Sequence, residues 1–174
     1  AALVRLAESD PSDDVLQSAA ALLGRQGSQA GFEVSLAAHA RHAGEPGWDF
    51  GRSVLAFAPH LSARLPRLLE ALRSPDSALR ATAAFVLGEA MRQRAVAEFP
   101  RREEIEALLV ACAGDPDPVV RTETLRGLVV RGDSAFGAAV AAAADPAPAI
   151  RLVGFEATKR RGFIVELFTR GLGD

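Results

Sequence analysis

The sequence of 174 residues is poor in aromatic and sulfur-containing side chains. It has no Tyr, one Trp, one Met and one Cys, and aromatic residues make up only 6% of the chain. The lone Cys112 cannot form an internal disulfide, and its place in the apolar run 108–113 predicts a buried, inert thiol. These shortages exclude an internal disulfide framework and a zinc site built on paired cysteines.

Long apolar runs and a surplus of either charge are missing as well. No run is long enough to span a bilayer and no signal peptide is evident, so we expect a cytoplasmic protein without a membrane partner. The 20 basic and 22 acidic residues give a net charge of −2. This balance argues against nucleic acid as a partner, because a phosphate backbone attracts a basic surface. No phosphate-binding loop, nucleophile elbow or dinucleotide-binding fingerprint occurs, and we predict no cofactor.

Alanine and other hydrophobic residues dominate what is present. Hydrophobic residues make up 49% and charged residues 24%, a balance typical of globular proteins. Alanine combines the highest helix propensity with a side chain small enough for close helix packing. The composition therefore favours packed helices over sheets.

A turn followed by an amphipathic helix recurs along the chain. The turns carry Asp-Pro or a related pair and begin at residues 10, 45, 74, 115 and 145, the copy at 45 being the faintest. Asp or Ser before a helix accepts hydrogen bonds from its first amides, and Pro fits the first turn because no helical hydrogen bond is lost there. Apolar residues then follow at every fourth position, which gives each helix one buried face. The pattern predicts about five helix pairs of unequal length.

Each turn separates the first helix of a pair from the second. The spacing predicts first helices at 29–42, 62–73, 101–113 and 133–143, and second helices directly after the turns. Five glycines are expected near helix ends, where a positive φ is often needed: Gly24, Gly44, Gly88, Gly132 and Gly162. Residues 163–174, which begin with the apolar run 163–168, either cap the last repeat, open a further repeat or form a self-association surface.

The turn pair, the apolar-Arg pair after it and the small and Leu positions that lead to a Gly resemble short HEAT repeats of the phycobilisome-lyase-like type. The copies that begin at Ser74, Asp115 and Asp145 are clear, whereas the copies at residues 10 and 45 lack the Arg at its usual position. The resemblance covers residues 3–162 and implies one domain over 1–174. The implied fold is an all-α, right-handed superhelix whose second helices line the concave side.

The resembling family includes adaptors, scaffolds, inhibitors and a few enzymes. Since no catalytic motif is present, we expect a non-catalytic scaffold or adaptor that binds another protein or a peptide on the concave face. The residues expected to face a partner flank the buried positions of the second helices: Thr82, Phe85, Glu89, Glu123, Arg126 and Glu156. Phe85 would anchor a peptide, since aromatic side chains dominate interface hot spots. Alternatively, the Phe85 ring turns inward and fills space beside neighbouring alanines.

Similar repeats carry an arginine that pairs with acids in the turns of its own and the adjacent repeat, forming a structural ladder. The arginines at this position are Arg80, Arg121 and Arg151, and the turn acids are Asp76, Asp115, Asp117 and Asp145. A column of guanidinium groups could instead bind carboxylates or phosphates. We favour the structural role because buried arginines are usually paired.

Three histidines are the candidates for a metal site. His39 and His42 stand three residues apart on a predicted helix and share one face. A third ligand would have to come from His60, Asp49 or Glu45, and we predict no metal site. Iron-dependent hydroxylases on similar repeats use His-Glu steps, and this sequence has none.

An enzyme or enzyme subunit on the same fold, glycosylase-like or lyase-like, is the alternative to a scaffold. DNA glycosylases built on HEAT-like repeats resemble this chain in architecture, but they need a basic concave face, aromatic clamps and a catalytic Asp. Trp48-Asp49 is the only Trp-Asp pair, and the net charge of −2 is a poor match to such a face. We therefore expect no enzymatic activity and no catalytic residue.

Overall fold

The computed structural model describes residues 2–10, 12–43, 57, 60–92, 101–128 and 133–159. These residues form α-helices and no strand, so the predicted all-α fold is confirmed. The features predicted at residues 44, 45, 48, 49, 132 and 162, and over 163–174, lie outside the described residues.

The helices follow the predicted order of pairs. They are α1 (Ala2–Ser9), α2 (Asp13–Arg25), α3 (Gln29–Arg41), α5 (Leu61–Ala71), α6 (Ser77–Arg92), α7 (Arg102–Cys112), α8 (Pro118–Gly127), α9 (Asp133–Ala143) and α10 (Pro148–Lys159). The four predicted first helices correspond to α3, α5, α7 and α9, with boundaries that differ by at most about two residues, as is usual at fraying helix ends. The described second helices are α2, α6, α8 and α10.

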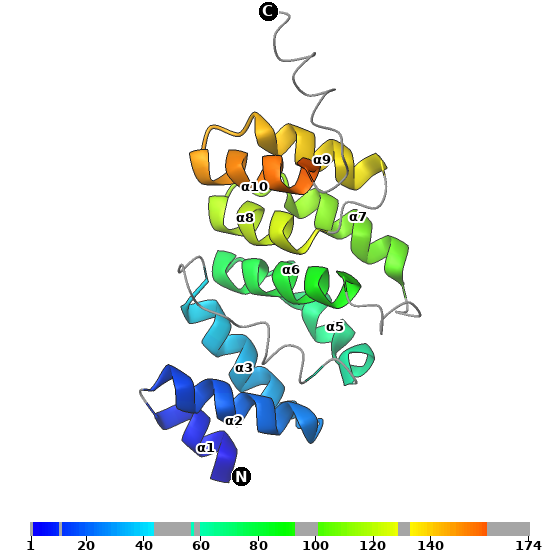
Figure 1. The fold of residues 1–174 in the computed structure, drawn as a ribbon. Helices are drawn as coiled ribbons and strands as arrows, with labels where there is room; N and C mark the ends of the chain where they lie inside the picture. The colour runs from blue at the N-terminus through cyan, green and yellow to red at the C-terminus, as the bar shows by residue number, and fades with distance from the viewer. Residues whose placement is uncertain are drawn as a thin grey trace, which may run out of the picture.

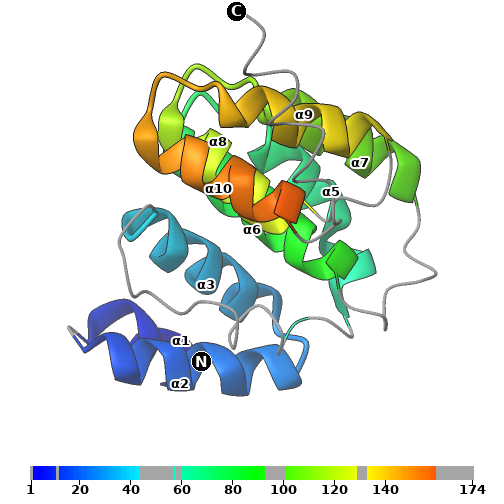
Figure 2. The ribbon, with the colours of Figure 1, turned by 45° about the horizontal axis from the view of Figure 1, so that its top comes forward.

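From α5 onward the pairs stack as two layers (Figure 1). Helices α5, α7 and α9 form one layer and α6, α8 and α10 the other, as the turned view makes clear (Figure 2). Contacts join α6 to α8 and α8 to α10 in the second layer, and α7 to α9 in the first. Leu68, Leu87 and Ile105, one from each of three neighbouring helices, are fully buried between the layers. Each repeat therefore buries its apolar face against its neighbours, which is the architecture of an α-solenoid.

The N-terminal part departs from strict alternation of the two layers. Helix α3, a first helix by its sequence, contacts α6 of the second layer as well as α1 and α2. Its buried stripe includes Phe32, Leu36 and His39, and the Phe32 ring meets the Phe57 ring edge-on at 5.5 Å. The sequence period identifies this apolar stripe but does not determine which helix covers it.

Glycines serve close helix packing more than helix ends. Gly88 lies inside α6 and faces Gly127 of α8, and a Cβ atom built on Gly88 would stand 2.5 Å from the Cα atom of Gly127. The expectation of a positive φ at Gly88 is therefore wrong, because this position needs the absence of a side chain instead. Among the described glycines, positive φ occurs at Gly27, where φ is 65° at the turn between α2 and α3.

Candidate interaction surface

An arginine ladder joins the turns of the last three repeats. Arg80 of α6 donates through Nε and Nη2 to both carboxylate oxygens of Asp115, at 2.9 and 3.0 Å. Arg121 of α8 makes the same two-fold contact with Asp145, at 2.8 and 3.2 Å. A planar guanidinium matches a carboxylate in this bidentate arrangement. Each of these two arginines thus ties its own repeat to the next one.

The remaining guanidinium nitrogen holds each arginine to its own turn. Nη1 of Arg80, Arg121 and Arg151 donates to the carbonyl oxygens of the two turn residues before each second helix, at 2.9–3.0 Å. The turn aspartates are equally well used, since Asp115 accepts from the amide of residue 117 and Asp145 from that of residue 147. Because their donors are engaged, Arg80 and Arg121 are not available to bind an outside anion.

Asp76 and Asp117 have different hydrogen-bond partners from the other two predicted ladder acids. Each accepts from a backbone amide two residues ahead, Asp76 from Ala78 at 2.9 Å and Asp117 from Val119 at 2.8 Å. They therefore cap α6 and α8, and no arginine hydrogen bond to either carboxylate occurs within the described ranges. The prediction that they pair with arginine is corrected on this point, because the guanidinium groups point toward the next repeat.

The ladder lowers the pKa values of its carboxylates. Burial would raise the pKa of Asp115, but the hydrogen bonds from Arg80 and from the Asp117 amide hold it below its ordinary value of 3.8. The hydrogen bond from Arg121 likewise holds the pKa of Asp145 below 3.8. A depressed carboxyl pKa stabilises the fold at pH values above 3.8, and this contribution is lost as the pH falls through the folded-state pKa.

Replacing Asp145 with Asn should lower the free energy of unfolding by about 2 kcal/mol, because a charge-assisted bidentate contact becomes a weaker neutral one. The Arg121 and Asp145 side chains are only 14% and 10% exposed, so water replaces little of the lost interaction. Urea unfolding at neutral pH measures the change. Asp14→Asn on the exposed face of α2 is the matched control, and equal losses in the two variants would contradict a special role for the ladder.

The ladder also sets a common register for the second helices. Two positions after Arg80 and Arg121, Thr82 and Glu123 are buried, and the Thr82 hydroxyl donates to the Ala78 carbonyl at 2.8 Å. Glu89 is buried as well. The expectation that these three residues face a partner is wrong, because α6 is covered by α3, α5, α7 and α8 and α8 is packed between α6 and α10.

Five positions after each ladder arginine, the side chains are more accessible. Phe85, Arg126 and Glu156 occupy this position on α6, α8 and α10, and we call these three residues the outer column. Arg126 and Glu156 are exposed, whereas Phe85 is half-buried. The Phe85 ring stacks on His39 of α3, with ring centroids 5.2 Å apart and planes 24° apart, so it contributes to the contact between α3 and α6.

Arg126 also forms an ion pair with a buried residue of its own helix. Its Nη1 donates to Glu123 at 2.7 Å, and the two side chains are 51% and 7% exposed. Burial raises the pKa of Glu123, while the Arg126 charge and hydrogen bond oppose that rise. Arg126 therefore neutralises a buried carboxylate on one side and presents the rest of its guanidinium to solvent on the other.

The three histidines do not gather around one point. His39 is buried in α3, and burial, with a smaller effect of His42, lowers its pKa to about 4. His60 packs beside the turn at Gly27, with ring atoms 3.0 Å from where a Cβ atom would stand. No group of three His, Cys, Asp or Glu side chains that could hold a metal ion occurs among the described residues.

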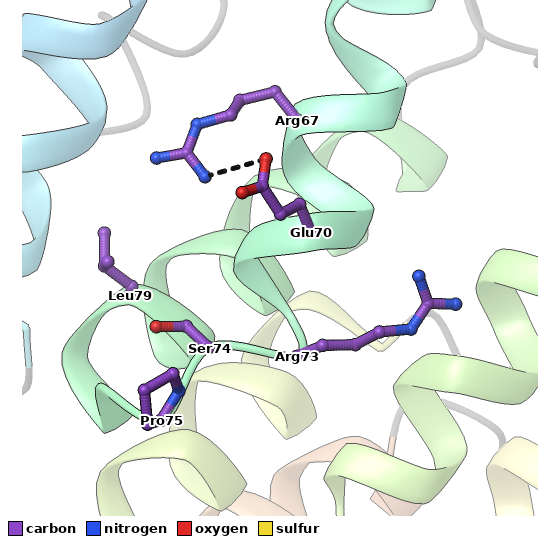
Figure 3. A pocket seen from close by; sticks show the side chains of 6 residues that line it. All are labelled: Arg67, Glu70, Arg73, Ser74, Pro75 and Leu79. Carbon is purple, nitrogen blue, oxygen red and sulfur yellow. Dashed lines mark ion pairs between the residues drawn. The ribbon is translucent and has the colours of Figure 1, made fainter.

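An open hollow of about 540 Å³ lies where α5 ends and α6 begins (Figure 3). Arg67, Glu70, Arg73 and Leu79 contribute to its lining. Arg67 is paired with Glu70 at 3.5 Å and with Glu33 of α3 at 3.1 Å, and Figure 3 shows Arg73 directed away from Arg67 and Leu79. The charged groups do not converge, so this hollow offers no built binding site.

Stacked helix pairs joined by an arginine ladder define an α-solenoid. The family model for HEAT repeats matches residues 65–158, which is more than half of the sequence. The chain therefore belongs to the HEAT-repeat family. The phycobilisome-lyase-like type of repeat stays a prediction, and a search of curated proteins finds no match. No helix in the described ranges is both long and apolar enough to cross a membrane.

Proposed function

We propose that this chain is a non-catalytic scaffold that binds another protein or a peptide through the outer column of its second helices. HEAT repeats generally form protein-interaction scaffolds, which supports the class of function. The observation that carries the choice of surface is Arg126. Its guanidinium is half-exposed although it is already held by Glu123, so a partner meets a charged group whose orientation is fixed in advance.

The chemistry of the outer column favours a partner with charges of both signs. Arg126 on α8 would accept an acidic side chain, and Glu156 at the same position on α10 would accept a basic one. The two exposed residues lie on neighbouring helices of one layer, because α8 and α10 are in contact. An extended or helical segment lying across the second-layer helices can therefore reach both charges.

The test replaces the Glu123–Arg126 ion pair as a unit. The double variant Glu123→Gln, Arg126→Gln removes the guanidinium without leaving a buried unpaired charge, so the fold should survive. Arg73→Gln, Glu103→Gln is the matched control, because it also removes one charge of each sign, at exposed positions after α5 and on α7. Circular dichroism checks that both variants keep the helical content of the wild type.

Proteins captured from a cell lysate by the wild type and the control, and lost by the ion-pair variant, are then purified and titrated by calorimetry. We expect the dissociation constant for the ion-pair variant to rise by about tenfold or more, and that of the control to stay within about twofold. A partner that binds the folded ion-pair variant as tightly as the wild type would rule out the outer column as the binding surface.

A further inference from the structure

Helix α3 covers one member of the outer column. Five positions after the ladder arginine, Arg126 on α8 and Glu156 on α10 are exposed, whereas Phe85 on α6 is half-buried. Helix α3 contributes to this burial, because it contacts α6 and places the His39 ring on the Phe85 ring, with centroids 5.2 Å apart. One part of the outer column is therefore already occupied by a helix of the same chain.

Helices α1, α2 and α3 form a packed unit. Each of the three contacts the other two. Helices α2 and α3 approach closely, since a Cβ atom on Gly31 would stand 2.4 Å from the Cβ atom of Leu23. The main described contact of this unit with the later helices is the one between α3 and α6. The unit can therefore tilt as one body relative to α6.

The start of α3 is held to α5 by two arginines. Arg64 donates to the backbone of the turn before α3 at 2.7 Å, and Arg67 donates to Glu33 in the second turn of α3 at 3.1 Å. His39 lies nearly two turns after Glu33, toward the other end of the helix. The two arginines thus provide a pivot at the start of α3, about which the His39 end can move away from Phe85.

The contact of His39 with Phe85 is weaker than the junction of α6 with α8. The α6–α8 junction combines the bidentate bond of Arg80 to Asp115 with a close backbone crossing. Between α3 and α6 no ladder bond occurs among the described residues, and the contact buries the imidazole of His39. A buried polar ring gains less from burial than an apolar ring does. Separation at His39 therefore costs less than separation of α6 from α8.

We propose that α3 is a built-in competitor for the outer column. When the α1–α3 unit tilts away from α6, a helix of the partner protein takes its place, stacks a flat ring on Phe85 and reaches Arg126 on the next helix with an acidic side chain. This inference rests on the proposed function, because the same column binds the partner, and it adds how that binding is regulated. The partner segment is helical because the surface at Phe85 already holds a helix. Since the closed form excludes the partner, binding weakens in proportion to the closed fraction.

Thiol labelling measures the opening of α3 without any partner. Ser35 is buried one turn before His39 on the same side of α3, so a thiol there reacts when that side separates from α6. In the full chain with Ser35→Cys and Cys112→Ala, adding His39→Ala should raise the labelling rate about fivefold, because the stacked ring is lost. His39→Phe keeps a flat ring on Phe85 and is the matched control, which should label like the parent. If His39→Ala does not fold, Phe85→Ala removes the other ring and should raise the rate by a similar factor.

A labelled peptide of residues 28–42 is the helix probe, because it contains α3 and the Ser28 cap. In fluorescence anisotropy it should bind full-length His39→Ala about fivefold more tightly than the wild type, since the internal competitor is weakened. His39→Phe should bind the peptide like the wild type. Adding Phe85→Ala to His39→Ala should weaken binding again by about fivefold, because the peptide then has no ring to stack on.

Two results would overturn the proposal. One is an unchanged labelling rate in a folded variant that lacks either ring, and the other is a peptide that binds His39→Ala no better than the wild type. Neither measurement involves Arg126, so the proposed function is judged separately by the ion-pair variant. Loss of captured partners by that variant, together with no effect of His39→Ala, would keep the outer column as the binding surface and reject α3 as its competitor.

Discussion

Replacing Gly88 with Ala should lower the free energy of unfolding by about 3 kcal/mol, close to the largest loss that overpacking usually causes. The added methyl group would lie 2.5 Å from Cα, 2.6 Å from the carbonyl carbon and 2.8 Å from the carbonyl oxygen of Gly127. All three atoms belong to the backbone, so no side-chain rotation relieves the clash. Helices α6 and α8 must move apart, which opens gaps in the core on either side.

The same crossing provides a graded comparison. A Cβ atom on Gly127 would stand 2.9 Å from the Gly88 Cα atom and 3.4 Å from the Ala84 carbonyl oxygen, so Gly127→Ala should cost less than Gly88→Ala. Gly137→Ala in α9 is the matched control, because its Cβ atom would meet nothing within 4 Å. That variant should gain about 0.5–1 kcal/mol from the better helix propensity of Ala. Urea unfolding midpoints rank the three variants, and any other order would contradict the close crossing.

Lowering the pH from 7 to 4.5 should cost the fold about 2–3 kcal/mol through His39 alone. The pKa of His39 falls from 6.5 to about 4 on folding. Between these two pH values the imidazole is therefore mostly protonated in the unfolded chain and mostly neutral in the folded chain. Stability therefore declines as the pH falls from 6.5 toward 4. The physical cause is burial beside the Phe85 ring, because an imidazolium ion there would lose most of its hydration.

His39→Phe isolates this contribution, since it keeps a flat ring against Phe85 and removes the titrating group. The variant should show a flatter dependence of unfolding free energy on pH between 6.5 and 4 than the wild type. Asp115 and Asp145 lose their contribution only below pH 3.8, outside that interval. Glu123 acts in the opposite sense, because its raised pKa favours the protonated carboxyl in the fold. Parallel curves for wild type and variant would show that His39 is not the source of acid sensitivity.

Helix boundaries could be predicted from sequence because an Asp before a helix and a Pro in its first turn act within one repeat. The ladder arginines were predicted from the resemblance to HEAT repeats, since their bonds to Asp115 and Asp145 join different repeats. Thr82 and Glu123 show what such patterns miss. Their offsets place them beside the apolar stripe, but whether that side meets solvent depends on how closely the neighbouring helix approaches.

Two features of the surface needed the structure as well. The stacking of Phe85 on His39 depends on the contact of α3 with α6, which joins segments far apart in the sequence. The exposed Leu152 and Phe155 were missed because their stripe looks like that of any other second helix.

The glycine crossing and the ladder together decide how freely one repeat can swing against the next. Arg80 and Asp115 hold the start of α6 to the turn before α8, and Gly88 and Gly127 bring the same two helices into close contact about two turns after Arg80. A single contact would let α6 and α8 rotate about it, but two contacts at separate points along the helices restrict that rotation. Helices α6 and α8 should therefore move as one rigid unit. The junction of α3 with α6 lacks a ladder arginine among its described residues, and bending of the array should concentrate there.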